Sequence, residues 1–143
     1  MTQHNHHTAP TQFVEANGIR FAYRRFGKTG GVPLVFNQHF RGTMDYWDPA
    51  VTDGLARNRE VILFNNAGVS SSSGQVPTTI QEMGANAVVF MKALGLSKVD
   101  VLGFFIGGIA GAIIHFTFDN SNSIVPHPAS GHALRGAPDY PKQ

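Results

Sequence analysis

Residues 99–108, Val-Asp-Val-Leu-Gly-Phe-Phe-Ile-Gly-Gly, decide the fold of this chain. The apolar run at 99–102 comes first, the glycine-bounded hexapeptide GFFIGG follows at 103–108, and a second apolar run begins at Ile109. This order predicts a buried strand, a tight glycine turn and then a helix, with Phe105 in the middle of the turn.

The segments before this stretch predict further strands. Residues 13–16 and 19–26 flank Asn17-Gly18, a dipeptide that suits the positive φ values of a type I′ hairpin turn. Short, continuously apolar runs at 32–37 and 60–64 indicate strands that are covered on both faces, as in a parallel sheet.

Two helices are predicted between these strands. The first begins at Asp48-Pro49, an N-cap residue followed by a proline at the first helical position, and extends to about Arg57. The second begins with a capping box of Thr79 and Glu82, and it ends at Gly95. Its apolar positions recur at helical spacing and predict a core-facing stripe: Ile80, Met83, Ala87, Phe90, Met91 and Leu94. Alternating strands and helices predict an α/β fold with a mostly parallel sheet and flanking helices.

Composition limits the class of protein. The chain has 143 residues, of which 42% are hydrophobic and 14% charged, values that fit one folded globular domain. The absence of cysteine excludes disulfides, zinc–thiolate sites and a cysteine nucleophile. The net charge is only +2, and four basic residues near the hairpin are interpreted as a solvated face rather than a nucleic-acid site: Arg20, Arg24, Arg25 and Lys28.

Both ends of the chain are predicted to be tails. Residues 1–12 show no apolar signal-peptide segment, so a cytoplasmic location is expected. They carry His4, His6 and His7, which are interpreted as part of a disordered polar tail rather than as metal ligands. The core is expected at 13–119, and residues 120–143, with four prolines, as an irregular C-terminal tail. No metal or other cofactor is expected.

Residues 101–118 also require comparison with a membrane span. They are largely apolar, and glycines at 103, 107 and 111 have the spacing of small residues in packed membrane helices. However, Asp100 and Asp119 flank the segment, no basic flank orients it, and four glycines disfavour one continuous helix. A buried strand, turn and helix explain the same residues, and no membrane contact is expected.

Three blocks of sequence resemble the α/β-hydrolase superfamily, specifically its esterase- and haloperoxidase-like members. Residues 35–49 are similar to the third strand and oxyanion loop of that family, and residues 61–72 to its fourth-strand block, usually D-x-R-G-x-G-x-S. Residues 93–108 are similar to the fifth strand and the nucleophile elbow. The blocks occur in the family's order, and the resemblance implies a partial α/β-hydrolase fold with the sheet order 1-2-4-3-5 and the later strands absent.

The resemblance also implies the positions of a site. Ligands of such sheets bind beyond the carboxyl ends of the strands, where the chain crosses over between strands 3 and 5. The backbone N–H groups of Phe40 and Ile106 correspond to the oxyanion-hole donors, and His39 to the histidine that organises the oxyanion loop. Gly103 and Gly107 correspond to the elbow glycines, and Phe105 occupies the position of the nucleophilic serine.

The elbow therefore lacks its nucleophile. Acyl transfer on this fold needs a nucleophile, a base and an acid, and the family's acid and histidine follow later strands. A substitute triad using a serine of the 70–73 run, otherwise interpreted as flexible turn, with His127, His132 or Asp139 has no support in the spacing. His115 is interpreted as a partly buried helix residue.

Three functions remain open at this stage. The first is a truncated, catalytically inactive protein related to carboxylic-ester hydrolases of small-molecule metabolism, in short a pseudoenzyme. The second is an active hydrolase completed by missing sequence or by a partner chain. The third is a non-catalytic binding or scaffold protein whose crevice takes a small ester-like or other apolar ligand. Because the fifth strand would be an open edge, we also expect self-association through it.

Overall fold

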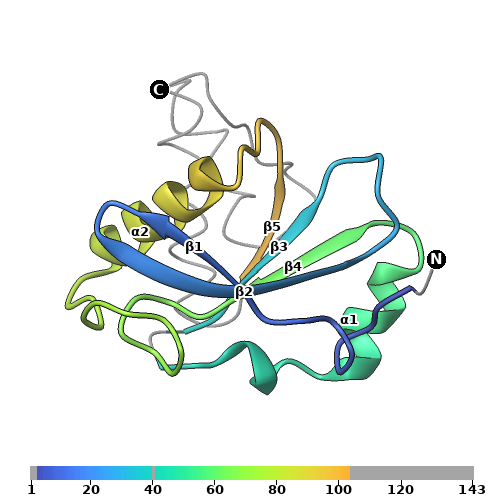
Figure 1. Cartoon of the computed structure of the whole chain (residues 1–143), viewed down its shortest axis with the longest axis horizontal. Coiled ribbons are helices and arrows are strands. Elements are labelled where there is room, and N and C mark those ends of the chain that lie inside the picture. Colours follow the sequence, from blue (N-terminus) through green and yellow to red (C-terminus); the bar gives the residue numbers. More distant parts are fainter. Residues whose placement is uncertain (1–2, 40, 104–143) are drawn as a thin grey trace, which may run out of the picture.

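The computed structural model describes residues 3–39 and 41–103. Their elements follow the chain as β1 (Gln12–Ala16), β2 (Ile19–Gly27), β3 (Leu34–Asn37), the short 3-10 helix η1 (Met44–Tyr46), α1 (Pro49–Ala56), β4 (Glu60–Phe64), α2 (Ile80–Ala93) and β5 (Asp100–Gly103) (Figure 1). The helix expected after residue 105, the membrane alternative for 101–118 beyond Gly103, and the tail at 120–143 lie outside the described residues.

The sheet has five strands in the order β1-β2-β4-β3-β5, which confirms the predicted order. β1 and β2 pair antiparallel, β2 pairs antiparallel with β4, and β3 pairs in parallel with both β4 and β5. The hairpin turn is also confirmed: Asn17 and Gly18 have φ values of 52° and 78°, as a type I′ turn requires.

Alternate residues of the central strands supply two separate hydrophobic clusters. In β4, Ile62 and Phe64 pack in the cluster that includes residues of α2, whereas Val61 and Leu63 pack in the cluster that includes Ala56 of α1. Because successive side chains of a strand point to opposite faces, the two helices cover opposite faces of the sheet (Figure 1). This double cover explains why the strands are apolar without alternation.

The helix ends follow their predicted caps. The Asp48 carboxylate accepts a hydrogen bond from the Ala50 N–H, and α1 continues to Ala56 with Arg57 as its C-cap. The Thr79 hydroxyl accepts one from the Glu82 N–H, while the Glu82 carboxylate accepts one from the Thr78 N–H. The core-facing stripe of α2 is buried as predicted at Met83, Ala87, Phe90 and Met91 and partly buried at its two ends.

The prediction of a disordered tail is wrong for the described residues before β1. Asn5 closes a turn, because its side-chain oxygen accepts the N–H groups of His7 and Thr8, each at 2.9 Å. His6 is only 2% exposed, and Ala9 packs in the cluster beneath α1. Polar residues are ordered here because partners 46 and 47 residues away, on α1, bind them.

Candidate functional site

The register of β3 and β5 brings two segments of the candidate site together. Asn37, the last residue of β3, pairs with Gly103, the last residue of β5. The loop that begins at Gln38 and the glycine-rich stretch that follows Gly103 therefore start side by side at the carboxyl edge of the sheet. This is the arrangement expected of a crevice at a topological switch point. Phe40, Phe105, Ile106 and Gly107, four of the candidate site residues, lie outside the described residues.

Two buried asparagines after β4 hold the loop that follows β3. The Asn66 side-chain NH₂ donates to the backbone oxygens of Gln38 and His39, both at 3.2 Å. The Asn65 side-chain oxygen accepts the Met44 N–H at 2.7 Å, at the far end of the same loop. We call Asn65 and Asn66 the asparagine clamp. Sequence reasoning missed the clamp, although two adjacent amides directly after an apolar strand were its signal.

His39 lies within this clamped loop and is partly buried. Its Nδ1 accepts a hydrogen bond from the Arg41 N–H at 3.4 Å, and its carbonyl oxygen accepts the Gly42 N–H at 3.1 Å. A Cβ on Gly42 would lie 2.0 Å from Cγ of Gln38, so this glycine allows the Gln38 side chain to fold back under the loop. The His39 ring thus contacts the backbone of its own loop.

The serine run at 70–73, expected to be a flexible turn, is instead bonded to its surroundings. The Ser72 hydroxyl donates to the backbone oxygen of Asn65 at 2.8 Å and accepts the Ala22 N–H at 2.9 Å. The Ser73 hydroxyl accepts the Arg20 N–H at 2.7 Å, and the Ser71 hydroxyl accepts from the Asn65 side chain at 3.1 Å. The Ser72 and Ser73 hydroxyls thus join β2 to the loop after β4. Ser72 is buried, and its hydroxyl proton is already donated to a backbone oxygen.

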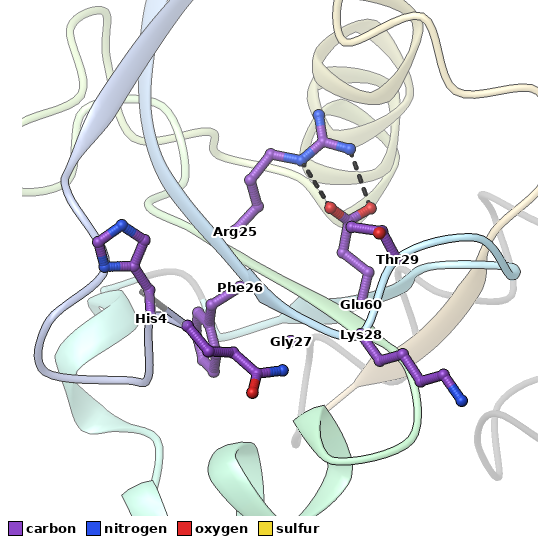
Figure 2. A pocket seen from close by; sticks show the side chains of 8 residues that line it. His4, Arg25, Phe26, Gly27, Lys28, Thr29 and Glu60 are labelled. Atoms are coloured by element: carbon purple, nitrogen blue, oxygen red, sulfur yellow. Dashed lines mark hydrogen bonds and ion pairs between the residues drawn. The ribbon is translucent and has the colours of Figure 1, made fainter. Parts of the chain in front are cut away.

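A hollow of about 470 Å³ lies at the opposite end of the sheet (Figure 2). It is lined by Gln3, His4, Arg25, Phe26, Gly27, Lys28, Thr29 and Glu60. Glu60 is the first residue of β4, so this hollow is at the amino end of that strand, away from the asparagine clamp. It is therefore separate from the candidate site.

The basic residues of the hairpin have partners within the chain. Arg25 forms a two-pronged hydrogen bond to the Glu60 carboxylate, at 3.1 and 2.9 Å, and this bond raises the pKa of Arg25 above its ordinary value. Arg24 pairs with Asp45, and the Arg20 guanidinium lies 3.9 Å from the centre of the Phe13 ring. The three arginine side chains thus interact with other residues of the same chain.

Neither a metal-binding cluster nor a membrane-spanning helix occurs among the described residues. Residues 3–39 and 41–103 contain no group of three or more His, Cys, Asp or Glu side chains able to hold a metal ion. Over the same residues, no helix has the length and apolar character that crossing a membrane requires.

The sheet order and strand pairing are those of an α/β-hydrolase fold, and the described strands form its N-terminal part. No family model matches the chain. Among solved structures, an alpha/beta hydrolase fold protein from Chitinophaga pinensis has 43% sequence identity and a TM-score of 0.76, over 85% of this chain and 43% of that chain. A hydrolase from Pseudomonas aeruginosa PA01 has 25% identity and a TM-score of 0.67, over 80% of this chain and 43% of that chain.

One curated relative carries a more specific name. "Putative carbamate hydrolase RutD" of Caulobacter sp. (strain K31) is 31% identical over 80 residues, which are 54% of this chain and 30% of that protein. This chain thus spans less than half the length of each of these three relatives. The recognition of the chain as an N-terminal part of the α/β-hydrolase fold is confirmed.

Asn66→Leu tests the asparagine clamp. The substitution keeps the side-chain size but removes the Asn66 donor to the oxygens of Gln38 and His39, which is expected to lower the free energy of unfolding by about 1–3 kcal/mol. Urea unfolding measures this loss, and hydrogen exchange should accelerate at the Gly42 amide, which bonds to His39. The matched control Asn58→Leu, at an exposed asparagine, is expected to change stability by less than about 0.5 kcal/mol. Equal losses in the two variants would contradict the clamp.

Proposed function

We propose that this chain is an α/β-hydrolase-like protein, related to hydrolases of carboxylic esters and carbamates, that does not itself catalyse acyl transfer. One observation carries the proposal: the Asn37–Gly103 pairing ends β5 beside the loop that follows β3. The next residues in sequence are those of the elbow, and Phe105 stands in its middle. The relationship to carbamate hydrolases is supported by the similarity to RutD over 80 residues.

The chemistry of the elbow position argues for inactivity. Acyl transfer needs an atom that attacks the carbonyl carbon, and a base that takes up the proton of that atom. The benzyl side chain of Phe105 offers neither an oxygen nor a sulfur. The Ser72 hydroxyl donates to the backbone of Asn65 instead of to a base. What the fold would retain is a place for a carbonyl oxygen.

The proposed site retains the oxyanion loop. In it, the N–H groups of Phe40 and Ile106 act as donors to a ligand carbonyl, and His39 organises the loop that carries Phe40. The asparagine clamp supports this assignment, because it restrains the carbonyls of Gln38 and His39 just before residue 40. Such a crevice takes a small ester-like or other apolar ligand and leaves it intact.

An active hydrolase is the second candidate function. The observation in its favour is coverage: the chain spans 43% of the Chitinophaga protein and 30% of RutD, so most of the length of these relatives has no counterpart here. In this alternative, a nucleophile, base and acid come from further sequence or from a partner chain. Self-association through the outer edge of β5, the last strand in the order of the described sheet, stays a prediction.

Labelling by a fluorophosphonate probe tests whether the 143-residue chain is inactive by itself. We expect the 143-residue chain to show no labelling and no turnover of short p-nitrophenyl esters above the blank. Phe105→Ser is expected to gain little, because triad members act as a unit and a lone hydroxyl has no base. Turnover by this variant at the rate of an ordinary esterase would reveal a base and overturn the inactive assignment. Stoichiometric labelling of the unmodified chain at any serine from 70 to 73 would do the same.

A further inference from the structure

The described residues before β1 are fastened at His6. Its imidazole Nδ1 lies 2.8 Å from the Thr52 hydroxyl of α1, and its backbone N–H donates to the Asp53 carboxylate at 2.8 Å. The ring also packs edge-on against Phe26 of β2, with ring centroids 6.3 Å apart. Since His6 is 2% exposed and Thr52 is fully buried, the side-chain contact is shielded from water.

We propose that residues 3–9 form a latch, which neutral His6 holds against α1 and β2 and which is released when the imidazole takes up a proton from solvent. The contacts that carry this proposal are the buried bond to Thr52 and the packing on Phe26. A neutral ring fits this apolar and hydroxyl-lined position. A charged ring there would lose its hydration, and among the described residues no carboxylate bonds to its nitrogens in exchange.

The charges that face His6 act in both directions. Burial lowers its pKa from the ordinary 6.5, and it is the largest cause of the shift. His7, in the same segment, and Arg24, on β2, lower the pKa further, whereas Asp53 on α1 and Asp45 on η1 raise it. The net direction is downward.

The sign of the pH effect follows from this direction. The released segment binds a proton more readily than the closed one, so the closed latch is fully stabilised above pH 6.5. Its stability is lost as the pH falls from 6.5 through the lowered pKa of the closed state. Each unit by which the closed state lowers the pKa multiplies the released fraction about tenfold at acidic pH.

Release would change two hollows on this side of the molecule. Gln3 and His4 line the 470 Å³ hollow together with Arg25, Phe26 and Lys28 (Figure 2). Gln3, His4 and Asn5 also line a neighbouring hollow of about 190 Å³, on the side of Ala56 and Arg57. The latch is thus one wall of both hollows, and its release would uncover the apolar side chains of Phe26 and Ala56.

Hydrogen exchange of the full chain at pH 7.5 and 5.0 tests the latch, with each rate divided by the intrinsic rate at that pH. The reporters are the amides of His6, bonded to Asp53, and Ala9, bonded to the Asn5 oxygen. We expect their protection to fall by about threefold or more at pH 5.0. The variant His6→Asn keeps a polar side chain that does not titrate, and it should show no such fall. The matched control His4→Asn, at an exposed histidine, should behave like the unmodified chain.

Several outcomes would overturn the latch. A fall in protection of the same size in His6→Asn would show that the pH dependence does not come from the His6 ring. Unchanged protection in the unmodified chain would show that His6 does not release the segment. The NMR titration of the His6 ring in the unmodified chain needs no variant, and a pKa at or above 6.5 would contradict the proposal directly.

Discussion

Replacing Phe90 by alanine is expected to lower the free energy of unfolding by about 3–5 kcal/mol, the cost of deleting a fully buried aromatic ring. Phe90 is 0% exposed, and its ring lies between α2 and the sheet. Its ring stacks on Phe64 of β4, with centroids 4.4 Å apart and planes 13° apart. It also contacts Phe21 and Tyr23 of β2, at 5.5 and 5.7 Å. One deletion therefore leaves a cavity between α2 and two strands, and urea unfolding followed by far-UV circular dichroism measures its cost.

Phe13→Ala provides the control for ring deletion. Phe13 is 42% exposed on β1, and its one ring contact among those described is the Arg20 guanidinium above it. Removal of this exposed cation–π contact is expected to cost less than about 1 kcal/mol. A Phe90→Ala variant that is as stable as Phe13→Ala would mean that α2 does not pack on the sheet as described.

The features that the sequence could predict are those with a local signal. Phe90 belongs to an apolar stripe with a period of 3.6, so its burial follows from spacing alone. Asn17-Gly18 and the caps at Asp48 and Thr79 act within a few residues of themselves. The strand order 1-2-4-3-5 was different, because it came from the resemblance of three blocks to a known family.

The features that the sequence could not predict depend on distant partners. His6 lies in a polar segment that has the composition of a tail. Its burial depends on the Thr52 hydroxyl, which is 46 residues away in the sequence. Ser72 lies in a run typical of a flexible turn, but it joins the Ala22 N–H, 50 residues away, to the loop after β4. Asn66 likewise binds carbonyls 27 and 28 residues before it. No local pattern specifies such contacts.

The elbow itself stands apart from both groups. The structure places Gly103 at the end of β5, beside Asn37. Phe105, Ile106 and Gly107 lie outside the described residues, so their roles are argued from sequence and from where β5 ends. This is why the assignment of an inactive elbow is tested by labelling rather than by geometry.

Gly68→Ala is expected to lower the free energy of unfolding by about 2–5 kcal/mol, through backbone strain together with overpacking. Gly68 has a φ of +77°, and a Cβ there would lie 2.3 Å from the backbone nitrogen of Val76. Its N–H donates to the Ser73 oxygen at 2.8 Å, which closes the loop after β4. Because this loop carries the asparagine clamp, the variant should also accelerate hydrogen exchange at the Met44 amide, which bonds to Asn65.

Gly30→Ala separates the two causes of that loss. Gly30 also has a positive φ, +104°, but a Cβ there would meet nothing within 4 Å. Its substitution therefore adds strain without a clash, and it is expected to cost only about 1–2 kcal/mol with no change at Met44. Equal losses in the two variants would show that the close approach of Gly68 to Val76 contributes nothing. Faster exchange at Met44 in Gly68→Ala alone would instead link the fourth-strand loop to the restraint of the loop that carries His39.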